Sequence, residues 1–163
     1  MNTALVSHLS RIDLSNAGSI GMMQCPGRTG DLADEIAALK AIGVDLVLSL
    51  MQDNEYPDLA AFIEAMSLNH VEWMRVPLVP GGGPIDGHEW SSIRAMLVEH
   101  ILNGGFVAIH CWGGLGRTGV VAADLLMAFG FDAAEAISHV RKVRPGTIES
   151  EEQELWIKRV NSA

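Results

Sequence analysis

The sequence predicts a single α/β domain over residues 1–163, in which a central, mostly parallel sheet is flanked by helices. Two observations predict this class. Short apolar segments with the composition of buried strands alternate with segments in which apolar residues recur at helical spacing. The chain then ends in helical patterns alone. Its length and its 48% hydrophobic content are sufficient for one core, and no internal repeat or second domain is visible.

The first half of the chain supplies two helix and strand pairs. Apolar residues at helical spacing predict a helix over 31–42, followed by a glycine where a C-terminal cap belongs. The β-branched segment 45–50 predicts a buried strand. A second apolar stripe predicts a helix over 59–68, and alternation predicts a strand over 71–76. The segment 77–84 reads PLVPGGGP and must be a loop.

The second half is predicted to hold the centre of the fold. Helical spacing returns over 87–103, and the apolar segment 106–109 is the most buried strand candidate. The following helix, 118–129, is apolar on nearly every face, which is typical of a helix in the middle of a domain. Helices over 133–143 and 149–160 complete the chain. The residues before 31 carry no assigned element.

Composition excludes several classes of partner and cofactor. The net charge of −9 disfavours nucleic acid and anionic membranes, because both attract basic surfaces. No apolar segment is long enough to span a membrane, and the N-terminus has no export signal, so a cytoplasmic location is expected. Two cysteines make no disulfide framework, and no His/Cys spacing suggests a metal site. We therefore expect no cofactor and no metal.

Residues 110–119 read HCWGGLGRTG and carry the chemistry that the sequence offers. They connect the last predicted strand to the central helix, a geometry in which backbone N–H groups and the helix dipole hold phosphate. Cys111 begins the loop and Arg117 ends it, with five residues between them. Arginine can bind two phosphate oxygens at once. The same field would stabilise a thiolate, and Thr118 could donate a hydrogen bond to it.

This arrangement predicts attack by sulfur on phosphorus through a cysteinyl-phosphate intermediate. Nucleophile, anion cradle and cation lie within seven residues of one another. The chemistry requires no metal, because Arg117 and the backbone amides neutralise the transferring group. A Walker-type nucleotide site is excluded because the loop contains no lysine.

Residues 110–119 match the H-C-x-x-G-x-G-R-[ST]-G signature, so the chain resembles the protein tyrosine phosphatase superfamily. The resemblance implies that Cys111 is the nucleophile and that His110 tunes the thiol indirectly. It further implies that the loop binds phosphate through Trp112, Gly113, Gly114, Leu115, Gly116 and Arg117. The segments around 21–50, 110–127 and 134–157 are similar to the dual-specificity branch that includes the kinase-associated phosphatases.

The chain departs from that branch at the general acid. The branch's acid loop runs approximately P-I-x-D-G-G-x-P, whereas residues 77–84 place Pro80 at the acid's position, and proline cannot transfer a proton. Asp86, six residues further along, is either a displaced general acid or a helix-capping residue. The reserve candidates follow the 45–50 strand, and they are Asp53, Glu55 and Asp58.

Three further residues have two interpretations each. The resemblance makes Gln153 a water-positioning residue, although an exposed helical glutamine would look the same. It places Cys25 near Cys111, where a protective disulfide could form under oxidation; otherwise Cys25 is a small buried side chain. Arg28 is either a substrate-binding cation or a solvated residue.

The sequence therefore predicts a phosphomonoester hydrolase that acts on phosphotyrosine, with phosphoserine and phosphothreonine as an extended range. The expected substrate is a phosphoprotein or an aryl phosphate, because the loop lacks the lysines that bind extra phosphates, and phosphate-like oxyanions are expected to inhibit. The alternative is a catalytically impaired phosphate-binding module that uses the same loop, favoured only by Pro80. A sulfurtransferase is disfavoured by the Gly-Arg-Thr-Gly ending.

Overall fold

A computed structural model describes residues 8–84 and 88–160, and its centre is a five-stranded sheet in the order β1-β2-β5-β3-β4. Only the edge pair β1–β2 is antiparallel; the pairs β2–β5, β5–β3 and β3–β4 are parallel. The predicted single α/β domain with a mostly parallel sheet is confirmed. The strands are β1 (Ser10–Asp13), β2 (Ser19–Met23), β3 (Leu46–Ser49), β4 (Glu72–Arg75) and β5 (Phe106–His110).

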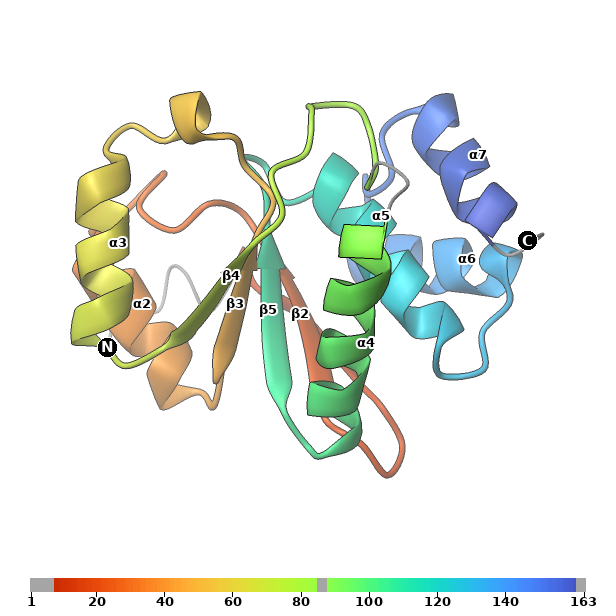
Figure 1. The fold of residues 1–163 in the computed structure, drawn as a ribbon, viewed down its shortest axis with the longest axis horizontal. Helices are drawn as coiled ribbons and strands as arrows, with labels where there is room; N and C mark the ends of the chain where they lie inside the picture. Colours follow the sequence, from red (N-terminus) through yellow and green to blue (C-terminus); the bar gives the residue numbers. More distant parts are fainter. Residues whose placement is uncertain (1–7, 85–87, 161–163) are drawn as a thin grey trace.

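Helices cover both faces of this sheet (Figure 1). One face carries α2 (Leu32–Ala41) and α3 (Leu59–Leu68), and the other carries α4 (His88–Leu102) and α5 (Gly116–Met127). Outside α5 lie α6 (Ala133–Val143) and α7 (Glu151–Val160). A short 3-10 helix, η1 (Asp53–Glu55), follows β3.

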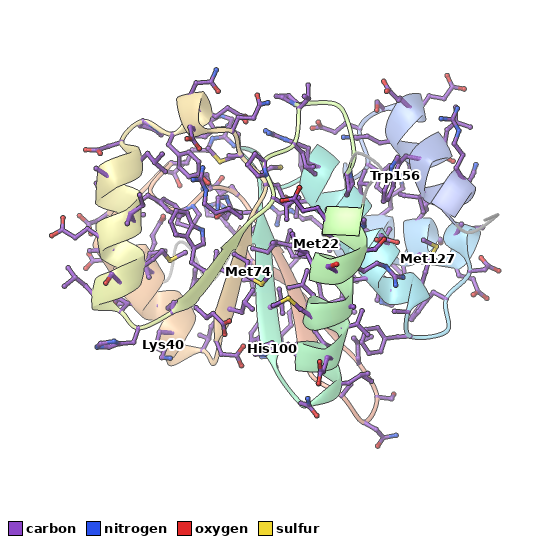
Figure 2. The ribbon with its side chains drawn as sticks, viewed as in Figure 1. Met22, Lys40, Met74, His100, Met127 and Trp156 are labelled. Carbon is purple, nitrogen blue, oxygen red and sulfur yellow. The ribbon has the colours of Figure 1, made fainter. Side chains whose placement is uncertain are left out.

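Two apolar clusters fill the space between the layers. The larger lies between the sheet and α4–α7, where Met22 and Met74 meet α4 (Figure 2). The smaller joins the opposite face to α2 and α3. Helix α5 is buried along residues 116–126, as expected for a central helix that is apolar on nearly every face. The core thus holds the start of α5 rigidly.

Two features differ from the sequence prediction. Strands β1 and β2 lie in the segment that carried no assignment, because each is short and neither has a long apolar pattern. Helix α5 begins at Gly116 rather than at 118, so Arg117 lies in its first turn instead of before it. The antiparallel β1 covers the edge of β2 and leaves β5 in the centre of the sheet.

The parallel arrangement brings the carboxyl ends of β3, β4 and β5 together. Ligands of open parallel sheets bind at this edge, where neighbouring connections diverge. The loop that follows β5 lies there, with η1 after β3 and the glycine-rich segment 79–84 after β4. Within the described residues, no helix is both long and apolar enough to cross a membrane.

Candidate active site

Cys111 stands at the end of β5, where the strand passes into the loop formed by residues 111–117. Its side chain is buried, with 4% of the residue exposed, and the Thr118 hydroxyl donates a hydrogen bond of 3.1 Å to Sγ. Because Thr118 lies in the first turn of α5, the sulfur faces the N-terminus of a helix. Both the hydroxyl and the helix dipole stabilise negative charge on sulfur.

The carbonyl groups of the 111–117 loop are bound from outside it. Trp112 O accepts from Cys25 N at 3.1 Å, Gly114 O from Arg144 Nε at 2.8 Å, and Leu115 O from Ile148 N at 3.1 Å. A planar trans peptide points its N–H opposite to its C=O. The N–H groups that follow these carbonyls therefore point into the loop, where they can bind an anion.

Gly114 gives the loop its shape. Its φ of +71° lies in the left-handed region, and a Cβ there would lie 2.2 Å from the carbonyl oxygen of Met23. Both observations require glycine, because the clash involves backbone and the conformation disfavours L side chains. The loop therefore packs closely against the end of β2.

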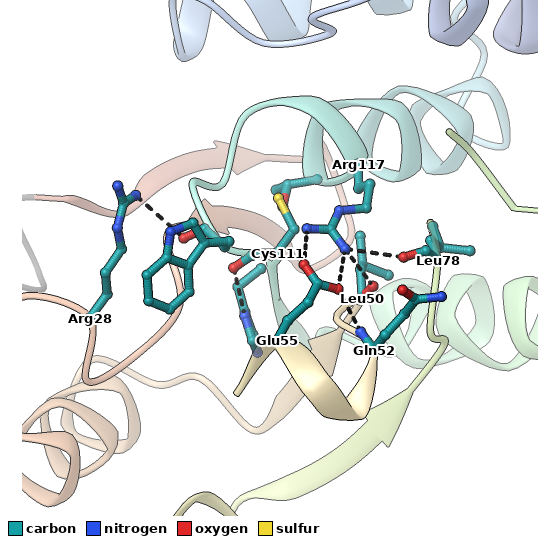
Figure 3. Close-up of polar contacts among 10 residues, drawn as sticks. Arg28, Leu50, Gln52, Glu55, Leu78, Cys111 and Arg117 are labelled. Atoms are coloured by element: carbon teal, nitrogen blue, oxygen red, sulfur yellow. Dashed lines mark hydrogen bonds and ion pairs between the residues drawn. The ribbon is translucent and has the colours of Figure 1, made fainter. Parts of the chain in front are cut away.

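Arg117 is held by a carboxylate from another element. Its Nη1 and Nη2 donate to the two oxygens of Glu55 at 2.8 and 2.7 Å, and Nη1 also reaches the carbonyl oxygen of Leu78 at 3.1 Å (Figure 3). Burial opposes the charge on Arg117. The hydrogen bonds that Arg117 donates to Glu55 and the charges of Cys111 and Glu55 outweigh that effect, so the pKa of Arg117 is raised.

His110 is buried directly behind the loop and is neutral. Burial lowers the pKa of His110 to about 4, against the opposing hydrogen bond to Cys111 O. Trp73 Nε1 donates to Ser49 Oγ at 2.7 Å, so the Ser49 hydroxyl is free to donate to His110 Nε2. His110 Nδ1 then carries the proton and donates to Cys111 O at 3.0 Å. This chain of bonds fixes the peptide that follows Cys111.

The four candidates for the general acid differ in their position and in their partners. Asp86 lies outside the described residues. Glu55 is bound to Arg117, whose hydrogen bond holds the pKa of that carboxyl below its ordinary range, so it is a poor proton donor. Asp53 pairs with Arg75, and Asp58 caps α3 by accepting from Ala61 N at 3.0 Å. Both are therefore engaged away from the loop.

Gln153 is completely buried, so the interpretation of it as an exposed residue is wrong. Its Oε1 accepts from Glu149 N at 2.9 Å and from Ser150 N at 3.3 Å, and its Nε2 donates to Gly82 O at 3.1 Å. The side chain thus connects the start of α7 to the glycine-rich segment. Its role in positioning water stays a prediction.

Cys25 and Arg28 both lie beside the loop. Both cysteines are free thiols, and burial is the main cause that raises the pKa of Cys25 to about 12. A disulfide with Cys111 stays a prediction. The Arg28 guanidinium lies 5.1 Å from the centre of the Trp112 ring, and Trp112 is 37% exposed. Arg28 and Trp112 thus form one side of the site's rim.

Two supporting residues escaped the sequence analysis. Ser49 connects Trp73 to His110, and Arg144 binds the Gly114 carbonyl while also donating to Ser10 Oγ at 3.1 Å. Neither follows a local pattern, because each acts on a loop far away in the sequence. The described residues contain no cluster of three His, Cys, Asp or Glu side chains that would suit a metal ion.

Residues 17–157 match the family model described as "Swiss Army Knife protein, DSP-PTPase phosphatase domain". The active form of Tk-PTP is similar to this chain, with 28% identity and a TM-score of 0.73 over 91% of this chain and 97% of that one. Kinase associated phosphatase with its catalytic-site cysteine changed to serine aligns with a TM-score of 0.82. That alignment has 23% identity and covers 95% of this chain and 94% of that one, so it shows that the two chains share a fold.

A curated relative matches over a shorter region. Tyrosine-protein phosphatase CDC14 of Candida albicans is 44% identical over 61 residues, which are 36% of this chain and 11% of that protein. The chain thus spans only about a tenth of that relative's length.

Proposed function

Because the chain belongs to the DSP-PTPase phosphatase domain family, we propose that it hydrolyses phosphomonoesters through a cysteinyl-phosphate intermediate. The observation that carries the proposal is the set of groups around Cys111 Sγ. A hydroxyl donor, inward-pointing N–H groups and a guanidinium held by Glu55 converge where a phosphoryl group would bind. Such preorganised donors stabilise the charge of the transferring group.

The reaction has two steps. The Cys111 thiolate attacks phosphorus, the ester P–O bond breaks, and its electron pair leaves with the ester oxygen, which takes a proton from a carboxylic acid. Water then attacks phosphorus and gives a proton to the same carboxylate, while the P–S bond breaks and its electrons return to Sγ. Arg117 and the loop amides bind the non-bridging oxygens throughout. Asp86 stays the sequence-based prediction for the acid.

We propose a phosphoprotein or aryl phosphate as substrate, with phosphotyrosine first and phosphoserine and phosphothreonine as an extended range. The loop supplies one cation, Arg117, and the rim adds Arg28 beside the exposed Trp112 ring. An aromatic ring at the rim suits an aryl ester. The net charge of −9 disfavours nucleic acid and anionic membranes, and phosphate-like oxyanions should compete for the loop.

The test is hydrolysis of an aryl phosphate as a function of pH by the intact protein, Cys111→Ser and Cys25→Ser. We expect Cys111→Ser to be inactive and Cys25→Ser to stay active, because only Cys111 lies in the loop. The Asp86→Asn variant is measured alongside. If Asp86 is the acid, its hydrolysis rate should fall by about 10²-fold, and its pH–rate profile should no longer decline at high pH. An intact protein that binds vanadate without turnover would instead be a phosphate-binding module.

A further inference from the structure

The turn between α6 and α7 places a carboxylate against the 111–117 loop. A Cβ on Gly116 would lie 2.7 Å from Glu149 Oε2 and 3.1 Å from Gln153 Nε2. The absence of a side chain at Gly116 thus leaves room for the Glu149 carboxylate beside the loop backbone. Glu149 is an exposed residue, so solvent reaches it on this side of the loop.

The backbone before Glu149 is held in an unusual conformation. Ile148 has a φ of +60°, which is an outlier for a β-branched residue. Its N–H donates to Leu115 O at 3.1 Å, and its own carbonyl accepts from Arg141 Nη2 at 3.1 Å. Backbone strain of this kind persists where surrounding contacts impose it, and it is concentrated at functional sites.

The residue after the strained position is also fixed. Gln153 accepts the backbone N–H groups of Glu149 and Ser150, and it donates to Gly82 in the glycine-rich segment. The main chain of Glu149 is therefore anchored on both sides. Only its side chain is free to turn toward a bound ligand.

Glu149 differs from the other acid candidates that the structure describes. The oxygens of Glu55 are bound by Arg117, Asp53 pairs with Arg75, and Asp58 caps α3. Within residues 8–84 and 88–160, neither carboxylate oxygen of Glu149 accepts a hydrogen bond. It is thus a carboxylate at the loop whose oxygens have no other structural task.

We propose that Glu149 is the proton-transferring residue of this site, an inference that rests on the proposed phosphatase function. When Sγ of Cys111 attacks and the ester P–O bond breaks, the Glu149 carboxyl gives its proton to the leaving oxygen. When water attacks the intermediate and the P–S bond breaks, the Glu149 carboxylate takes the proton from water. One residue thus serves both steps and supplies the general acid that Pro80 cannot provide.

The charge of the substrate supports this assignment. Two anionic groups in one site cannot both stay ionised at low cost. A phosphate dianion in the loop therefore favours the protonated form of a carboxyl placed beside Gly116, and that is the form a proton donor requires. The Glu55 carboxylate already offsets the charge of Arg117, so the phosphate dianion in the loop is only partly neutralised.

The experiment compares the intact protein with Glu149→Gln on phenyl phosphate and 2,4-dinitrophenyl phosphate. Release of the phenol in the first turnover is measured, because this isolates phosphoryl transfer to Cys111. We expect a loss of about 10²-fold on phenyl phosphate, whose leaving group needs a proton, and little loss on the dinitrophenyl ester. Glu151→Gln, an exposed carboxylate on α7, is the matched control and should behave like the intact protein.

The outcomes separate the two proposals. An equal loss on both esters, or no loss, overturns the role of Glu149, as does the same leaving-group dependence in Asp86→Asn instead. No phenol from either ester with the intact protein overturns the phosphatase function itself. Vanadate affinity checks that Glu149→Gln keeps its loop. Glu149→Asp, which retains an acid, should recover part of the phenyl phosphate rate.

Discussion

At the scale of single residues, Arg117 keeps its charge although only 5% of the residue is exposed. The guanidinium has no freedom to search for a ligand, because Glu55 binds it at two points and the Leu78 carbonyl at a third. A cation fixed in this way loses little entropy when an oxyanion binds. Glu55 is thus a positioning residue, which acts through Arg117.

Replacing Glu55 tests that role. Glu55→Gln removes the charge that pairs with a buried guanidinium, so we expect a loss of about 3 kcal/mol in the free energy of unfolding. Vanadate should also bind about tenfold more weakly, because Arg117 loses its orientation. Denaturant unfolding and vanadate titration measure the two effects. Glu64→Gln, on the exposed face of α3, is the control. Unchanged vanadate affinity would contradict the positioning role.

His110 makes stability depend on pH. Its pKa falls from an ordinary 6.5 to about 4 through burial, so the unfolded chain binds a proton that the folded protein does not. This difference in proton binding contributes to the free energy of unfolding. The contribution is complete above pH 6.5 and is lost progressively as the pH falls to about 4. It amounts to about 3 kcal/mol. Denaturant unfolding at several pH values, together with NMR titration of the His110 ring, measures this.

A variant isolates the contribution of His110 from those of the carboxylates that titrate in the same range. His110→Asn should flatten the pH dependence between 6.5 and 4, whereas His70→Asn, at an exposed position with a φ of +53°, controls for the loss of a histidine. An NMR titration midpoint near 6.5 would show that the buried ring is not held neutral.

At the scale of elements, the 111–117 loop keeps its shape because neighbouring elements bind its carbonyls. One loop carbonyl accepts a hydrogen bond from each of three segments: the Cys25 segment, Arg144 at the end of α6, and the turn at Ile148. The N–H groups of the loop are therefore left pointing inward. The inward-facing N–H groups thus belong to the loop, but their geometry is set by three segments outside it. Helix α5 then adds its dipole at the same point.

Gly114→Ala tests whether close packing on β2 matters beyond the glycine conformation. Gly130 is a matched control, since its φ of +96° is also left-handed but a Cβ added there would meet nothing within 4 Å. Both alanine variants should lose about 1 kcal/mol or more of stability from the conformation alone. Only Gly114→Ala should also lose vanadate binding, because its Cβ would displace the end of β2. Equal effects on vanadate would contradict this.

At the scale of the whole molecule, parallel strands collect residues from distant parts of the chain at one edge. Ser49 from β3, the Leu78 carbonyl after β4 and Cys111 after β5 meet there, and the α6–α7 turn closes the other side. The resemblance to dual-specificity phosphatases is confirmed by the family match over residues 17–157.

The acidic balance of the whole protein should influence substrate choice. With a net charge of −9, long-range repulsion opposes an acidic phosphopeptide and attracts a basic one. We expect a higher kcat/KM for a phosphotyrosine peptide flanked by lysines than for one flanked by glutamates. The ratio should fall as salt rises from about 0.05 M to about 0.5 M. A ratio that is independent of salt would assign the preference to local contacts instead.

The sequence alone determined the parts of this protein that are local. Cys111, the glycines and Arg117 lie within one short segment, so their common site follows from connectivity. The burial of α5 follows from a helix that is apolar all round. Strand β5 was predicted from a continuous apolar segment, because such segments are typical of central parallel strands.

Only the tertiary structure decided which distant residues complete the site. Glu55 and Arg117 are 62 positions apart, and no pattern around Glu55 separates it from Asp53 or Asp58. Glu149 reaches Gly116 because α6 and α7 fold back over α5. Spacing along a chain reports local periodicity, whereas contacts between elements depend on how the sheet and its connections converge. The partner of the arginine and the carboxylate at the rim therefore appear only in the folded molecule.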